Sequence, residues 1–123
     1  MDKLEYYRHL IRKVLTEYYE LGSKSTNSKL ENVLVFDEEH DNYLLMVMGW
    51  QGEERIKVNT IHVRLRDGKI WIEEDWTEDG VVTDFLQAGV SREEIVLAFH
   101  PPHLRQYTEF AIALSHLIRL KFR

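Results

Sequence analysis

Residues 61–79, IHVRLRDGKIWIEEDWTED, decide the fold of this chain. Two runs of alternating apolar and polar residues flank Asp67-Gly68, and this dipeptide favours a type I′ turn because both central residues need positive φ. A two-residue loop also fixes the register of the resulting β-hairpin. The predicted pairs are Arg66 with Lys69, Leu65 with Ile70, Arg64 with Trp71, Val63 with Ile72 and His62 with Glu73.

The two faces of this hairpin differ in character. One face is apolar and should belong to the core: Val63, Leu65, Ile70 and Ile72. The other face presents His62, Arg64, Trp71 and Glu73. An indole among charges on an exposed face can mark a binding surface, since desolvated aromatic and Arg side chains dominate interface energies. The structural alternative is that Arg64 lies over Trp71 as a cation–π pair, worth about 0.5–1 kcal/mol when exposed.

The segments before the hairpin predict one helix and two further strands. Apolar residues at spacings of three and four indicate an amphipathic helix that begins near a capping box of Asp2 and Glu5 and ends at Gly22. Two segments are prone to form strands, at 30–36 and 43–50. The two strands of the hairpin are expected at 55–66 and 69–75. The run LLMVM at 44–48 is apolar on both faces, which is typical of a central strand covered on both sides. A slip in the alternation of 55–66 predicts a bulge near Asn59-Thr60.

The segments after the hairpin read as short helices. Residues 81–88 predict a helix ended by Gly89, and Ser91 with Glu94 predicts a capping box that opens a helical turn through 95–97. Residues 104–114 read as an irregular or extended piece. The fold class is therefore α+β: an N-terminal helix, an antiparallel four-stranded meander sheet, then short C-terminal helices. We expect one domain over 1–123, of which 114–123 form a basic-apolar tail.

Composition restricts the classes of function. The net charge of −5 argues against autonomous binding of nucleic acid, which depends on Lys and Arg that neutralise phosphates. The chain has no cysteine, and hence no thiol nucleophile or thiolate metal site. It starts without the apolar stretch of a signal peptide, and no apolar run approaches the roughly 18 residues of a membrane span. We therefore expect a cytoplasmic protein that makes no membrane contact.

The residues suited to catalysis form only weak patterns. His62 facing Glu73, with Asp75 just beyond, is a minimal acid–base arrangement. His100 and His103 are separated by two prolines, which prevent helical chelation of a metal. We predict no catalytic residue, no metal and no cofactor, and keep a hydrolase built on His62, Glu73 and Asp75 as an alternative.

Charged and mixed segments offer further binding surfaces. Residues 73–79 contain five acids, which can accept a basic partner or supply negative charge to the start of the next helix. Arg105 can fold back onto these acids or anchor a partner's carboxylate through its bidentate fork. The tail at 117–123, LIRLKFR, alternates apolar and basic residues. This pattern is compatible with an added edge strand or subunit contact, and equally with docking on its own domain.

Several spaced motifs in order carry a resemblance to a known family. They are the opening MDKLEYYRHLI, Ile61-His62-Val63, Asp67-Gly68-Lys69-Ile70-Trp71-Ile72, Asp75-x-Thr77-Glu78-x-Gly80, Ala88-Gly89-Val90, Ile95-Val96-Leu97-x-Phe99-His100, Pro102-x-x-Arg105 and Thr108-x-Phe110-Ala111. On these motifs the chain resembles the XisI family, the controlling factors for excision of the fdxN element. The resemblance covers nearly the whole chain.

The resemblance implies an accessory protein in programmed DNA rearrangement. In such a system a site-specific recombinase cuts and joins the DNA, and XisH, which resembles a restriction-type nuclease fold, is needed together with XisI. We therefore expect a non-enzymatic regulator that binds an XisH-like protein. A site-specific recombinase complex is a further expected partner, and the chain is compatible with a homo-oligomer. The residues that we expect to bind a partner are His62, Arg64, Trp71, Glu73, Asp75 and Arg105. The alternative is a DNA-binding excision-directionality factor that uses the basic tail.

Overall fold

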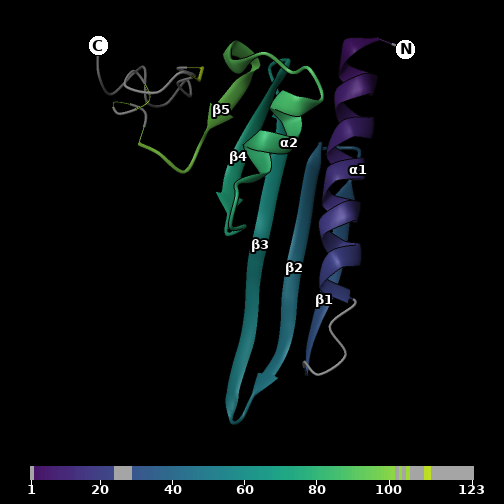
Figure 1. The fold of residues 1–123 in the computed structure, drawn as a ribbon, viewed down its shortest axis with the longest axis vertical. Coiled ribbons are helices and arrows are strands. Elements are labelled where there is room, and N and C mark those ends of the chain that lie inside the picture. The colour runs from purple at the N-terminus through teal and green to yellow at the C-terminus, as the bar shows by residue number, and fades with distance from the viewer. Residues whose placement is uncertain (1, 24–28, 102, 104, 106–109, 112–123) are drawn as a thin grey trace.

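The computed structural model describes residues 2–23, 29–101, 103, 105, 110 and 111 (Figure 1). The elements are α1 (Lys3–Ser23), β1 (Leu30–Asp37), β2 (Asn42–Gln51), β3 (Glu54–Arg66), β4 (Lys69–Asp75), α2 (Val81–Gln87), the 3₁₀ turn η1 (Arg92–Glu94) and β5 (Ile95–Leu97). The strands form one sheet in the order β1-β2-β3-β4-β5. β1 to β4 are antiparallel neighbours, whereas β5 is parallel to β4. The predicted α+β class is confirmed, with five strands in place of four.

α1 begins as its sequence predicts and ends differently. The Oδ1 atom of Asp2 accepts a hydrogen bond of 2.8 Å from the Glu5 amide, which confirms the N-terminal cap. Gly22 lies inside the helix, so the prediction that it ends α1 is wrong. A Cβ atom at Gly22 would lie 2.5 Å from Nδ2 of Asn32, so this glycine allows β1 to approach the helix closely.

Ionic and hydrogen-bonding contacts fix α1 to one end of the sheet. Arg8 Nε lies 2.9 Å from Asp41 Oδ1, and the Tyr43 hydroxyl donates a 2.9 Å hydrogen bond to the same oxygen. Burial opposes ionisation of Asp41, but these donors outweigh it and keep the pKa of the carboxyl below its usual value. At the neighbouring turn, Glu94 accepts hydrogen bonds from Lys3 and from the Tyr7 hydroxyl.

The β3–β4 hairpin follows its predicted register over most of its length. Asp67 has φ 52° and Gly68 has φ 73°, as a type I′ turn requires. The first four predicted pairs are confirmed. The fifth is wrong, because His62 pairs with Glu74 and a bulge leaves Glu73 as the extra residue of β4. The bulge predicted in β3 is confirmed, since Leu45 pairs with Ile61 and Met46 with Asn59.

The core lies on one face of the sheet, which we name the inner face. Both helices contribute to it, as do the inward side chains of all five strands. Its fully buried residues are Ile11, Leu15, Tyr43, Ile61, Val63, Ile70, Ile72, Val81, Phe85 and Ile95. Neither α1 nor α2 covers the opposite, outer face. The prediction that β2 is covered on both sides therefore fails for the described part of the chain, where Leu44, Met46 and Met48 are only half-buried.

The segment after α2 departs most from its prediction. α2 is confirmed, and Gly89 follows it with φ 94°. Residues 95–97 are strand β5 and not a helical turn, and all three are buried beside β4. Ser91 makes no side-chain cap, so the predicted capping box is wrong. The tail at 114–123 and most of 104–114 lie outside the described residues. No helix within the described ranges is long and apolar enough to cross a membrane.

Candidate functional site

The outer face of the hairpin brings His62 and Arg64 of β3 together with Glu73 and Trp71 of β4. Each is half-buried except Trp71, which is buried. The Nε2 atom of His62 lies 3.1 Å from Oδ1 of Asn42. Burial lowers the pKa of His62, although the charge of Glu73 opposes this effect. The imidazole is therefore neutral at neutral pH, and it is positioned by a neighbouring strand.

Trp71 is not exposed as the sequence predicted. Its side chain is 6% exposed, and its Nε1 donates a 3.0 Å hydrogen bond to the Arg66 carbonyl. The guanidinium carbons of Arg66 and Arg105 lie 5.2 and 5.7 Å from the centre of its ring, in place of the predicted Arg64. The reason is the path of the chain after β5. The amide of Ala98 donates to the Ile72 carbonyl at 2.9 Å, which starts a turn that brings Arg105 onto the outer face of β4.

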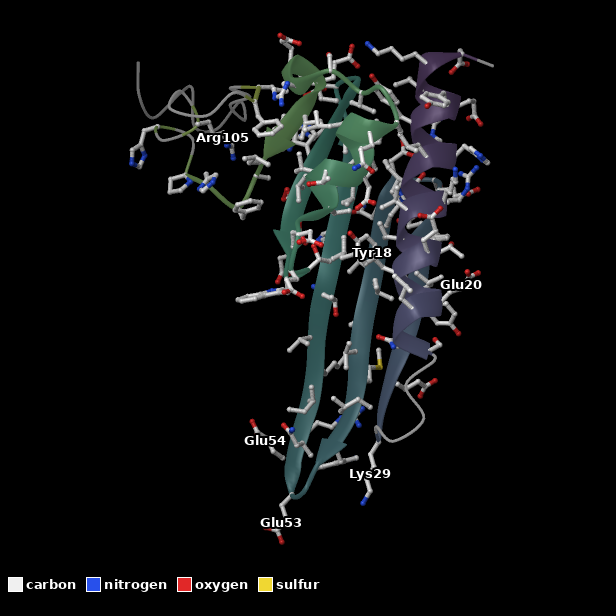
Figure 2. The ribbon with its side chains drawn as sticks, viewed as in Figure 1. Tyr18, Glu20, Lys29, Glu53, Glu54 and Arg105 are labelled. Atoms are coloured by element: carbon white, nitrogen blue, oxygen red, sulfur yellow. The ribbon has the colours of Figure 1, made fainter. Side chains whose placement is uncertain are left out.

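Arg105 is an internal group in this arrangement. It is 5% exposed, lies at the β5 side of the sheet (Figure 2), and donates from Nε to the His100 carbonyl at 3.2 Å. Burial lowers the pKa of Arg105 and the charge of Glu73 raises it. Oε2 of Glu73 is itself buried and has no hydrogen-bond partner among the described residues. Of the two interpretations of Arg105, the structure favours the one in which it folds back toward the acids.

Asp75 lies apart from the other five predicted residues. It pairs with Ile61, whose side chain belongs to the inner face. Its Oδ1 accepts from the amide and hydroxyl of Thr77 at 3.0 and 2.6 Å, and its Oδ2 accepts from the Val81 amide at 2.7 Å. The carboxylate thus fixes the loop that leads into α2.

The three residues of the hydrolase alternative are therefore not brought together. Glu73 and Glu74 both lie close enough to His62 to act on its pKa, but Asp75 is engaged with its own loop. Within the described ranges, no group of three or more His, Asp or Glu side chains is placed to hold a metal ion.

The sequence analysis missed an apolar row on the outer face of β1 and β2. Register and alternation place on this face Val33, Val35, Leu44, Met46 and Met48. Val35 is 41% exposed, and the others are half-buried. The run LLMVM at 44–48 already indicated a strand that is apolar on both faces, and in the described part of the chain both α1 and α2 pack on the inner face. The row continues toward His62, which pairs with Leu44.

Trp76 is a further surface residue that the sequence-based predictions did not include. It follows β4 directly and is 77% exposed, the largest value among the exposed large hydrophobic residues of the described chain. Its Nε1 lies 3.4 Å from Oε2 of Glu74. An indole at the end of a strand inside an acidic segment is visible in the sequence, but its exposure depends on where β4 stops.

Comparisons with known proteins agree on one family. The model of the XisI protein family matches residues 1–112. The crystal structure of the fdxN element excision controlling factor XisI from Anabaena variabilis ATCC 29413 is 42% identical, with a TM-score of 0.81, and the match covers 91% of this chain and 100% of that one. An XisI-like protein from the same organism is 35% identical, with a TM-score of 0.82 and the same coverage. A search of curated proteins gave no match.

Proposed function

The chain belongs to the XisI family, and we propose on that basis that it is a controlling factor for the excision of a DNA element. The observation that carries this proposal is the match to a solved excision controlling factor over 91% of the chain at 42% identity. The proposal thus rests on sequence identity over most of the chain and not on a shared architecture alone.

We infer that the protein acts without catalysis, by binding an XisH-like partner of nuclease fold. The outer face supports this inference, since it combines the apolar row with the half-buried His62 and Arg64. Contiguous apolar side chains rimmed by polar ones are typical of protein interaction sites. Trp71 and Arg105 lie on the same face over β4, where both are buried and offer little exposed area to a partner.

The charge of the chain suggests how such binding would control DNA. Residues 73–79 contain five acids, of which Glu78 and Asp79 are exposed and Glu74 is half-buried, and the whole chain has a net charge of −5. An acidic surface is attracted to the basic surface with which a nuclease holds DNA. Binding there would limit access to DNA without any contact between this chain and the phosphates.

Co-expression with an XisH-like protein tests the proposal. We expect the two chains to co-purify, and expect Arg64→Glu and Met46→Asp each to weaken binding at least tenfold. Lys13→Glu and Leu21→Asp make the same chemical changes at exposed positions of α1 and should bind like the unaltered chain. Absence of co-purification, or equal binding by all four variants, would contradict it. A steeply salt-dependent mobility shift that disappears without residues 114–123 would support direct DNA binding instead.

A further inference from the structure

Half of β3 has an open edge. β3 runs from Glu54 to Arg66, but β4 pairs with it only from Ile61 onward. Residues 54–59 therefore pair with β2 on one side and with no described strand on the other. Figure 1 shows the β2–β3 hairpin extending well beyond the end of β4, and Figure 2 places Glu53 and Glu54 at its tip. The amide of Trp76 makes the last hydrogen bond to this edge, to the Thr60 carbonyl at 2.9 Å.

A hollow lies at the step where β4 stops. Its volume is about 460 Å³, and its lining residues are Lys57, Val58, Asn59, Thr60, Glu74 and Trp76. The four β3 residues are consecutive, and successive side chains of a strand point to opposite faces. A hollow lined by consecutive residues therefore lies beside the strand, in line with the sheet. This is the position that the next strand would occupy.

Trp76 differs from the other two tryptophans in that no cation of the described residues lies over its ring. Arg55 lies 5.4 Å from the ring centre of Trp50, and two arginines lie over Trp71. Among the described residues, no Lys or Arg lies over the ring of Trp76, although it is the most exposed of the three. Glu74 contacts its Nε1, and the exposed Glu78 and Asp79 follow it in the chain. An open aromatic face beside carboxylates attracts a cationic side chain.

We propose that the open edge of β3 at 54–59 binds an extended segment of a partner protein as an added strand, and that an Arg or Lys of this segment lies over Trp76. In such strand addition, main-chain hydrogen bonds supply affinity and side-chain sites supply specificity. Lys57 and the bulge at Thr60 disfavour indiscriminate pairing at the edge, so the occupant is a short segment with matching charge. The inference rests on the proposed function in that this chain acts by binding a protein.

A titration followed by NMR tests the inference with a defined probe. The probe is a nine-residue peptide of alternating Thr and Val with a central Arg, and its controls carry a central Glu or N-methylated alternate amides. We expect the Arg peptide to shift the indole N–H signal of Trp76 and the amide signals of 54–59, and to leave the indole signals of Trp50 and Trp71 unmoved. It should bind at least fivefold more tightly than the Glu peptide, and the N-methylated peptide should not bind.

Two tryptophan variants provide the matched comparison. Trp76→Ala should weaken peptide binding at least tenfold, whereas Trp50→Ala, at another exposed indole, should change it less than twofold. Equal effects of both variants, or unimpaired binding of the N-methylated peptide, would overturn the inference. The inference would also be overturned if the Trp76 signal did not respond to the peptide but moved with protein concentration, which would identify a second copy of the chain as the occupant. A response of this signal to a DNA duplex and not to the peptide would identify DNA as the occupant.

Co-purification separates this inference from the proposed function. If the XisH-like protein binds the unaltered chain and Trp76→Ala equally well, the edge is not its docking site and the inference fails while the proposed function holds. If the XisH-like protein does not bind at all but the Arg peptide does, the proposed partner is wrong and the inference holds.

Discussion

Replacement of Arg105 by alanine tests whether this residue is part of the folded interior. The change removes a cation from the ring of Trp71, worth about 0.5–2 kcal/mol, and the hydrogen bonds to the carbonyls of His100 and Ala98, each about 1–1.5 kcal/mol for long charged bonds. It also removes the positive charge of Arg105 that interacts with Glu73, whose Oε2 atom is buried. Because Arg105 regains solvation in the unfolded chain, part of this sum is offset, and we expect a net loss of about 3 kcal/mol.

Thermal and urea unfolding measure this loss. For a domain of this size, about 3 kcal/mol corresponds to a decrease in Tm of roughly 10 °C. Arg55→Ala is the matched control, since it removes an Arg from the exposed ring of Trp50 and should cost less than about 1 kcal/mol. In a double-mutant cycle with Trp71→Phe, the Arg105→Ala change should show a coupling of about 1 kcal/mol. A Tm within 2 °C of the unaltered protein, together with lost binding to an XisH-like protein, would refute the structural role and restore Arg105 as a contact residue.

Three further predictions follow from the turn, the α1 contacts and the outer face. Gly68→Ala should lower the free energy of unfolding by about 1–2 kcal/mol, because φ at this position is 73°; urea unfolding measures the change. Tyr43→Phe should cost about 1–2 kcal/mol and bring the pKa of Asp41 closer to its usual value. The contribution of Asp41 to the free energy of unfolding is present above the ordinary pKa of an Asp and is lost as pH falls through the lowered pKa of Asp41. Tyr43→Phe should therefore lose less stability in acid than the unaltered protein. The pKa of His62 is lower in the folded chain than in the unfolded chain, so its contribution to the free energy of unfolding is fully present above about pH 6.5 and is lost as pH decreases through the lowered pKa. His62→Gln should flatten this part of the stability profile against pH.

The turn chemistry made the first part of the hairpin predictable. Asp67 and Gly68 fix the turn by their own backbone preferences, and a two-residue loop fixes the pairs next to it. Prediction fails at Glu73, because a bulge depends on contacts that are distant in the sequence. Glu74 accepts a hydrogen bond from Asn59 at 3.1 Å, and Asp75 holds the loop before α2. No local pattern indicates either contact.

The prediction for 95–97 failed for a related reason. Ser91 and Glu94 have the spacing of a helix cap, and three apolar residues are too short a run to distinguish a strand from a helix. Ile95 and Leu97 are fixed by parallel pairing with β4, a neighbour more than 20 residues earlier in the chain. The burial of Trp71 follows from the same pairing, since the chain that leaves β5 carries Arg105 to its ring. One missed strand thus changed the predicted site from an exposed indole to a buried one.

The lengths of the strands bear on why this fold should bind a partner. β3 has 13 residues, whereas β4 has 7 and β5 has 3, so the sheet narrows to the three strands β1, β2 and β3 at the far end of β3. Here β3 has an edge at 54–59 without a described neighbour, and β2 presents Met46 and Met48 on a face that neither α1 nor α2 covers. Such a projection gains stability from any strand added at its edge or any surface placed on its apolar row. The step in strand length thus accounts for the open edge of β3 and the hollow beside Trp76, and the position of α1 and α2 on the inner face accounts for the apolar row. A partner bound as proposed would cover all three.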